Sequence, residues 1–272
     1  MKKKEKTILL LIILLALALR LAHWLDVRED PFFASLVMDS EEYDRWAVEI
    51  ANGDWLGSEV FFQAPLYPYF LAVVYSVFGH SLDAVYLLQI IFSLFGMYAL
   101  YRAGKKIAGE KVGLAAAAIS ALYGLYIFYD VQLLKESLAV TMVCFLLWIL
   151  VETRESDGFA LWILAGVIGG FLSLLRENML LIVPFLILLA YRPRARFSAF
   201  VLRGVLLLFG TAIILLPVAF RNWKVGGNFL PTTFQGGVNF YIGNNPGATG
   251  TYQPLSPGKQ DKGGKTFPGF QH

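Results

Sequence analysis

The sequence predicts an all-α, polytopic membrane protein. Of its 272 residues, 57% are hydrophobic and 16% are charged, whereas soluble domains are roughly 45–50% apolar and about 25% charged. Several apolar runs also approach the ~20 residues that a membrane-spanning helix needs. The formal net charge is only +3, and the basic residues form short clusters between apolar runs, which argues against a nucleic-acid-binding protein.

About seven segments are long and apolar enough to be predicted as membrane spans. The first, residues 8–25, follows a lysine-rich start that looks like a signal peptide. No small-x-small cleavage site comes after it, so we expect an uncleaved first span. The sixth span is short, and we expect Pro184 to bend or start it. The six later spans are residues 82–103, 112–129, 131–151, 159–175, 178–191 and 198–220.

One further apolar stretch, residues 65–78, is expected to form an interfacial or re-entrant helix on the outer face. It is too short to cross a ~30 Å hydrocarbon core, and it is rich in Tyr and Phe, which favour the interface. If it does not span, three strong basic clusters, at residues 2–6, 102–111 and 192–203, share one side of the membrane. Basic loops face the cytoplasm, so we expect a cytoplasmic N-terminus and an outer, periplasmic or extracellular, active site.

Two regions are predicted on this basis. Residues 1–221 form a transmembrane module whose outer loop, residues 26–81, holds two interfacial helices. Residues 222–272 form an outer-face loop rich in Gly, Pro and Asn. No apolar run closes this loop, so we expect the chain to be a fragment of a longer protein. Cys144 is the single cysteine, which excludes an intrachain disulfide and a cysteine-based metal cluster.

The outer loop carries the first candidate catalytic residue, Asp39. It follows the apolar residues 36–38 and opens a predicted helix that ends near Asn52. Asp39 is expected to cap this helix, with Glu42 completing a capping box. It is also expected to act as a general base, whose pKa partial desolvation near the membrane surface would raise. The two roles are compatible.

Charged residues near the start of the fourth span are candidates for the same site. Ionisable groups at membrane depth usually line a cavity or a pathway. Lys135 and Glu136, about one turn into this span, either reach to the interface or form a cavity wall that faces the outer loop. Asp130, just before them, is expected to be a solvated residue at a helix end.

Two arginines on the outer side are candidate phosphate ligands. Arg176 lies in a junction between two spans together with Glu177 and Asn178. It belongs either to a charged turn or to a phosphate site, because the planar guanidinium matches phosphate oxygens. Arg221, at the end of the last span, is either a second phosphate contact or an interfacial anchor.

The segment after the last span carries hydroxyl and amide groups suited to a hydroxyl-rich ligand. The candidates are Asn239, Tyr241 and Asn244. No cluster of His and Glu has metal-ligand spacing, so no metal is predicted from a motif. A divalent cation held by carboxylates alone, with Asp39 among them, is compatible with the sequence.

The order of several short motifs adds a family resemblance to this interpretation of the residues. They are Asp-x-x-x-Tyr at 39–43, Gln-Ala-Pro-Leu-Tyr-Pro at 63–68, Leu-Lys-Glu-Ser-Leu at 134–138, Leu-Arg-Glu-Asn at 175–178 and Gly-Gly-Val-Asn-Phe-Tyr-Ile-Gly-Asn-Asn-Pro at 236–246. In this order and spacing, the chain resembles the dolichyl-phosphate-mannose protein mannosyltransferase superfamily, including its bacterial aminoarabinose transferase relatives. The resemblance covers nearly the whole chain.

The resemblance implies a GT-C fold and a polyprenyl-phosphate-linked sugar donor, with transfer on the non-cytoplasmic face and, in general, inversion. It places the catalytic aspartate at Asp39, a phosphate-binding cation at Arg176 and an acidic site residue at Glu136. The chain departs from the aminoarabinose transferases at Glu42, where they have a basic residue, and at Gln63-Ala64, where they have Glu-Lys. These departures put aminoarabinose and lipid A specificity in doubt.

The sequence thus predicts a glycosyltransferase with Asp39 as base and no certain cofactor. Its expected partners are a polyprenyl-phosphate-linked sugar, a protein, lipid or glycan acceptor, and membrane lipids. A lipid-linked-sugar binder or flippase is the main alternative and would not need Asp39. An ion-driven transporter is a weaker one and would pair its charges near the bilayer midplane. The expected substrate-binding residues are Glu42, Tyr43, Gln63, Lys135, Glu136, Arg176, Glu177, Asn178, Arg221, Asn239, Tyr241 and Asn244.

Overall fold

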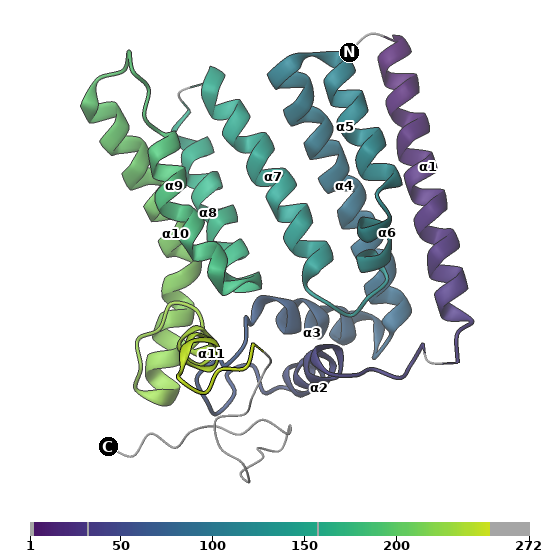
Figure 1. Ribbon diagram of the computed structural model, residues 1–272, viewed down its shortest axis with the longest axis vertical. Coiled ribbons are helices and arrows are strands. Elements are labelled where there is room, and N and C mark those ends of the chain that lie inside the picture. The colour runs from purple at the N-terminus through teal and green to yellow at the C-terminus, as the bar shows by residue number, and fades with distance from the viewer. Residues whose placement is uncertain (1–2, 32, 157, 251–272) are drawn as a thin grey trace.

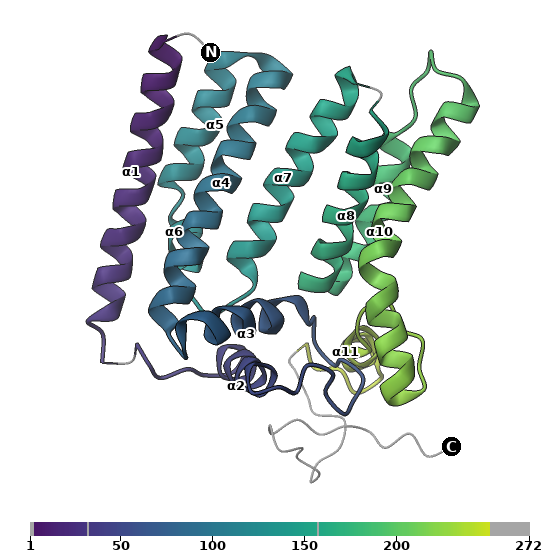
Figure 2. The same cartoon turned by 180° about the vertical axis from the view of Figure 1, so that it is seen from behind.

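The computed structural model describes residues 3–31, 33–156 and 158–250. This part of the chain contains eleven α-helices and one 3-10 helix, and it contains no strand, in agreement with the predicted all-α class. One group of helices runs side by side as a bundle, and three short helices lie at the end of the bundle opposite the N-terminus (Figures 1 and 2). We call these three helices the end layer. They are α2 (Asp39–Ala51), α3 (Leu66–Phe78) and α11 (Gln235–Asn244).

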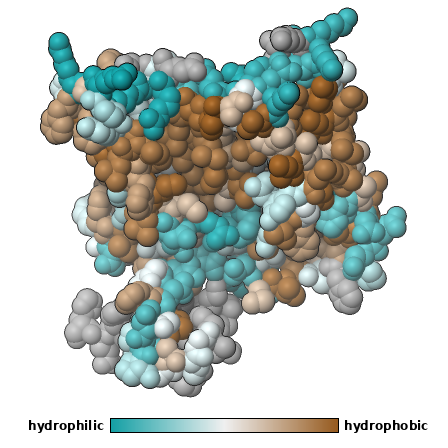
Figure 3. Space-filling model, turned by 45° about the horizontal axis from the view of Figure 1, so that its top comes forward, coloured by the Kyte–Doolittle hydropathy of each residue, from teal (hydrophilic) through white to brown (hydrophobic). Residues whose placement is uncertain are grey.

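The bundle follows the predicted apolar runs. Four of its helices, α1, α4, α7 and α10, are long and apolar enough to cross a membrane. The others are shorter, so the count of seven spans stays a prediction. A band of hydrophobic residues crosses the visible face, with hydrophilic residues above it (Figure 3). The bundle consists of α1 (Lys3–Arg28), α4 (Leu82–Ala108), α5 (Glu110–Leu122), α6 (Gly124–Asp130), α7 (Glu136–Glu155), α8 (Phe159–Leu175), η1 (Glu177–Leu181), α9 (Ile182–Leu189) and α10 (Phe197–Gly226).

The predicted boundaries differ from the helices in three places. The expected span over 112–129 is broken at Tyr123, between α5 and α6, and residues 131–135 form a linker rather than the first turn of a span. Glu136 is therefore the first residue of α7, not a residue one turn inside it. The short predicted span over 178–191 begins as η1, and Pro184 lies in the first turn of α9, where a missing N–H is tolerated.

Helices α8 and α10 approach each other through glycines. A Cβ built on Gly166 would overlap the carbonyl oxygen of Leu207, and one built on Gly210 would overlap that of Ile163. Small residues at a helix–helix contact let the backbones come close. The two glycines therefore set the α8–α10 distance, and with it the position of the α8 C-terminus, where Arg176 lies.

Helices α2 and α3 of the end layer pack on the bundle through an apolar core. Tyr43, Ala47 and Ile50 are buried on one face of α2, at the i, i+4, i+7 spacing of a helix side. They pack with the buried face of α3, including Tyr67 and Leu71. This contact holds α2 crosswise at the end of the bundle (Figure 1), close to the starts of α7 and η1.

Candidate active site

Polar groups from three parts of the chain meet where the end layer joins the bundle. The centre is Tyr43, whose side chain is buried and whose hydroxyl has no hydrogen-bond partner among the described residues. Burial is the main cause that raises the pKa of Tyr43, and nearby negative charges raise it further. These charges come from α2, α7 and η1: they are Asp39, Glu136, Glu42 and Glu177.

Two cations lie among these carboxylates. Arg176, which follows the last residue of α8, forms an ion pair with Glu136. The Lys135 ammonium lies over the Tyr43 ring, 5.8 Å from its centroid. Together with Asp39, Glu42 and Glu177, these residues form what we call the Tyr43 cluster. Glu136 and Arg176 are thus in contact, and Asp39 lies near enough to Tyr43 to affect its pKa. That the three residues act as one site stays a prediction.

The Tyr43 cluster leaves buried oxygens unpaired. Glu136 Oε2 and Glu177 Oε2 have no hydrogen-bond partner in the described part of the chain, like the Tyr43 hydroxyl. Leaving a buried polar group without a partner costs about 1–3 kcal/mol. Buried orphans in one cluster therefore indicate a place where a ligand supplies the missing donors and acceptors.

Asp39 differs from its prediction in two respects. It is the first residue of α2, preceded by Met38 at φ 55°, and no side chain caps the helix, so the capping box does not form. Its side chain is exposed, so the protein itself does not shield the carboxylate from water as expected. The cap fails because the N-cap position is held by Met38, one residue before Asp39. Glu42 instead accepts a hydrogen bond of 3.0 Å from Gln63 Nε2.

Arg221 is engaged elsewhere. Its Nε donates to the Leu56 carbonyl at 2.7 Å, and its Nη1 donates to the Glu59 carbonyl at 2.6 Å. The guanidinium also lies 3.7 Å from the centroid of the Phe61 ring. Arg221 thus ties α10 to the loop after α2. Its roles as a phosphate contact or an interfacial anchor stay predictions.

In the described structure no side-chain hydrogen bond or ion pair joins the remaining predicted binding residues to the Tyr43 cluster. Asn178 is an exposed residue of η1, next to Glu177. Asn239, Tyr241 and Asn244 are exposed on α11, and the Asn244 amide bonds to the Phe240 carbonyl of its own helix. Their role in binding stays a prediction.

A second polar group lies inside the bundle and was missed in the sequence. Arg20 of α1 and Asp130 of α6 form an ion pair of 2.7 Å, and their side chains are only 1% and 2% exposed. Asp130 also accepts a hydrogen bond from Ser137. The expectation that Asp130 is solvated is therefore wrong, because α1 supplies a charge partner that lets it be buried. An arginine inside an apolar run was the available signal.

This ion pair belongs to a network that supports the linker before α7. Gln89 of α4 donates to the carbonyls of Asp130 and Gln132, at 3.1 and 2.9 Å. Its Oε1 accepts a bond of 2.8 Å from the hydroxyl of Tyr67. The Tyr67 ring packs edge-on against the ring of Tyr43, with centroids 5.3 Å apart. We call this set the Arg20–Asp130 network. It holds both the start of α7 and Tyr43 in place.

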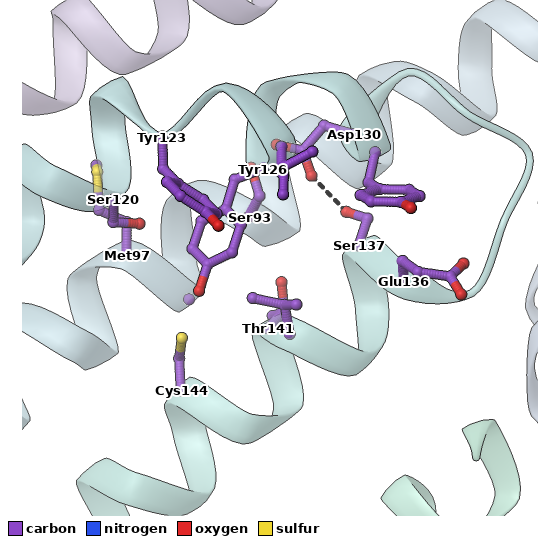
Figure 4. A pocket seen from close by; sticks show the side chains of 14 residues that line it. Ser93, Met97, Ser120, Tyr123, Tyr126, Asp130, Glu136, Ser137, Thr141 and Cys144 are labelled. Carbon is purple, nitrogen blue, oxygen red and sulfur yellow. Dashed lines mark hydrogen bonds between the residues drawn. The ribbon is translucent and has the colours of Figure 1, made fainter.

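A cavity of about 260 Å³ lies beside this network, between α4, α5, α6 and α7. Figure 4 shows the hydrogen bond between Asp130 and Ser137 at its wall, with Glu136 at one end of α7 and Cys144 further along the helix. Most of the remaining wall is formed by apolar and aromatic side chains, including Tyr126. The cavity is thus a mainly apolar space that has a carboxylate of the Tyr43 cluster, Glu136, in its wall.

A metal gains no support from this geometry. No group of three or more His, Cys, Asp or Glu in the described ranges is arranged to hold a metal ion.

The chain matches the family model of dolichyl-phosphate-mannose-protein mannosyltransferases over residues 63–221. This is more than half of the chain, which therefore belongs to that family of GT-C-type glycosyltransferases and is an integral membrane protein. The matched segment includes Gln63, the linker before α7, Glu136 and Arg176, whereas Asp39 precedes it. A search of curated proteins found no match.

Proposed function

We propose that the protein transfers a sugar from a polyprenyl-phosphate carrier to an acceptor on the non-cytoplasmic side of the membrane, with Asp39 as general base. The observation that carries this proposal is the Tyr43 cluster. It brings Asp39, a carboxylate–guanidinium pair and three unpaired buried oxygens to one junction. Membership of a glycosyltransferase family supports the reaction class.

Arg176 is the proposed ligand of the donor phosphate. Its side chain is 36% exposed, and its partner Glu136 is 23% exposed, so a phosphate can reach the guanidinium. A phosphate offers a bidentate partner of higher charge than the carboxylate. Lys135, next to Glu136, adds a second positive charge that the same phosphate can use.

The cavity beside α7 is the proposed site for the first part of the polyprenyl chain. It is walled mainly by apolar and aromatic side chains and reaches Glu136, which pairs with Arg176. Apolar burial of a prenyl chain there contributes roughly 25 cal/mol per Å². The carrier would thus lie with its chain along α7 and its phosphate at the outer end of the helix.

The transfer step then uses groups on both sides of the sugar. The Asp39 carboxylate accepts the proton of an acceptor hydroxyl, and the acceptor oxygen forms a bond to the anomeric carbon. The bond between that carbon and the phosphate oxygen breaks, and the lipid phosphate leaves with the electron pair. Arg176 and Lys135 stabilise the charge that develops on this leaving group. Attack opposite the leaving group inverts the anomeric centre.

A lipid-linked-sugar binder or flippase is the second candidate. Asp39 is exposed and precedes the matched segment, whereas Arg176 and the cavity lie within it. A protein that only binds the carrier needs Arg176 and the cavity but does not need Asp39. Loss of the Asp39 carboxylate therefore separates the two functions.

The experiment compares the full chain with Asp39→Asn in membranes supplied with labelled polyprenyl-phosphate sugars. We expect a loss of transfer of at least about 100-fold, with donor binding kept. Asp26→Asn, another exposed aspartate before α2, is the matched control and should transfer normally. Full transfer by Asp39→Asn would reject the proposed base. No transfer by the unchanged chain, with donor still bound, would favour the binder.

A further inference from the structure

A second pocket lies next to the Tyr43 cluster and shares Glu42 with it. It has a volume of about 240 Å³ and is formed by one face of α2, with Glu42, Trp46 and Glu49, by the loop over 54–63 and by Arg221 of α10. Glu42 and Gln63 line it and also contact each other. The pocket therefore adjoins the proposed site of transfer without being part of the donor cavity.

The charged groups of this pocket are strongly unbalanced. Four carboxylates line it against one guanidinium, that of Arg221. This guanidinium donates to the carbonyls of Leu56 and Glu59, so its position is fixed by the loop, and it is outnumbered by the carboxylates around it. The four carboxylates belong to Glu42, Glu49, Asp54 and Glu59.

An independent observation points to a ligand with hydrogen-bond donors. Gln63 is only 5% exposed, and its Nε2 is used by Glu42. Its Oε1 is buried and has no partner among the described residues, although the residue lines the pocket. A buried amide oxygen that lacks a hydrogen-bond donor within the protein can be satisfied by an N–H or O–H group of a ligand.

The walls of the pocket are held in place before any ligand binds. Trp46 and Phe61 lie with ring centroids 5.5 Å apart. Asn222, which is fully buried, accepts a bond from the Phe61 backbone N–H and donates to the carbonyls of Leu230 and Thr232. A preorganised pocket loses little entropy on binding, and an indole face attracts cations.

We propose that this pocket binds a primary ammonium group of the acceptor. Carboxylates, an unpaired amide oxygen and an indole face all favour a cation that donates several hydrogen bonds, and the excess of carboxylates over the single guanidinium disfavours an anion. The ammonium serves as a recognition handle and not as the nucleophile, because its protonated nitrogen has no free lone pair. A neighbouring hydroxyl of the same acceptor would then reach the Tyr43 cluster. This inference rests on the proposed transferase function.

Binding of small probes to the full chain in nanodiscs tests the pocket without requiring transfer. The soluble probes are methyl glucosaminide, its N-acetyl form and methyl glucoside, which differ at one position of the ring. We expect only the amine to bind, and its binding to weaken with added salt, as an interaction between charges near the surface does. Equal binding of the three probes would overturn the proposal.

A double substitution, Glu49→Gln with Glu59→Gln, removes two negative charges from the pocket at nearly constant shape. We expect affinity for the amine to fall about fivefold to tenfold. The matched control is Glu29→Gln with Glu41→Gln, which removes the same charge from exposed residues that do not line the pocket. Unchanged amine affinity in the pocket variant, or an equal fall in the control, would also overturn the proposal.

Two further arms identify the source of the ammonium and separate this inference from the proposed function. Vesicles of phosphatidylethanolamine, compared with N-acetylated phosphatidylethanolamine, test a lipid amine, and the glucosaminide tests a soluble one. Asp39→Asn should keep amine binding while it loses transfer, because Asp39 does not line the pocket. If Asp39→Asn binds the amine and still transfers normally, only the role of Asp39 as general base is rejected. If transfer needs Asp39 but the unchanged protein does not prefer the amine probe, only the proposed pocket is rejected.

Discussion

The Arg20–Asp130 network and the Tyr43 cluster are both assemblies of charged and hydroxyl groups, yet they differ in how fully they are paired. In the first, Asp130 is held by Arg20 and Ser137, and Gln89 uses both ends of its amide. In the second, Tyr43, Glu136 and Glu177 each keep a buried oxygen without a partner. A satisfied network stabilises a single arrangement, whereas an unsatisfied one indicates a site for a ligand.

The largest effect on stability is expected from Asp130→Ala. This change leaves the Arg20 charge buried without its partner, and breaking one half of a buried ion pair costs roughly 3–5 kcal/mol. Thermal unfolding of the detergent-solubilised protein measures the loss. The double variant Arg20→Met with Asp130→Ala should be less destabilised than Asp130→Ala alone. If Asp130→Ala unfolds at the temperature of the unchanged protein, the network does not stabilise the bundle.

The next effect concerns the helix contact that places Arg176. Gly166→Ala puts a methyl group against the backbone of Leu207, and such overpacking typically costs about 1–3 kcal/mol. Gly169→Ala is the matched control in the same helix, because its added methyl would lie 3.7 Å from Leu186, an ordinary contact. Thermal unfolding should show a loss for Gly166→Ala alone. An equal response of the two variants would contradict the proposed close approach.

Arg176→Gln should affect activity far more than folding. Removing a cation that stabilises the leaving phosphate is expected to lower the transfer rate about 100-fold to 1,000-fold, since Arg176 is partly exposed and not part of the core. Transfer from labelled donor and the unfolding temperature are measured on the same preparation. Arg45→Gln, an exposed arginine on α2, should leave transfer unchanged. A large loss of transfer in Arg45→Gln would show that transfer depends on the overall positive charge and not on Arg176 in particular.

The smallest and sharpest comparison is between two tyrosines. Tyr67→Phe removes a hydroxyl that bonds to Gln89 and should cost about 1 kcal/mol. Tyr43→Phe removes an unpaired hydroxyl, so stability should stay the same or rise slightly, while donor affinity falls. Unfolding and donor binding measure the two effects. Equal destabilisation by both substitutions would show that Tyr43 has a partner within the protein.

The raised pKa of Tyr43 gives this comparison a dependence on pH. Its hydroxyl stays protonated in the folded state at a pH where an unfolded tyrosine, with a pKa of about 10, ionises. The contribution to stability is therefore complete below pH ~10 and is lost as pH rises above it. Tyr43→Phe should lose less stability than the unchanged protein between pH 10 and 11, relative to its value at pH 8.

Much of the fold was accessible from residue order alone, because helix formation in apolar runs depends on local hydrogen bonds and composition. The apolar runs became bundle helices, and residues 65–78 became α3, which lies in the end layer (Figure 2). The break at Tyr123 was not accessible in this way. The linker over 131–135 was also missed, because the carbonyls of Asp130 and Gln132 bond to Gln89, which lies more than 40 residues earlier in the chain.

The candidate site was accessible as a list of residues but not as a set of contacts. The types and order of Glu136, Arg176 and Tyr43 indicated the chemistry, and the structure placed them together. Glu42 bonds to Gln63, and Arg221 bonds to carbonyls of the loop after α2. Both hydrogen bonds depend on where separate segments of the chain meet. No local pattern encodes such a meeting.

The sequence by itself determined the helical membrane class, the apolar runs and the kinds of charged group available to a glycosyltransferase. Only the tertiary structure decided which charges are paired and which are left open. Asp130 shows the reason: its neighbours in sequence indicated a solvated helix end, but α1 brings Arg20 to it. The energy of a charge depends on its distance to other charges and on its access to water, and both are set when distant helices pack.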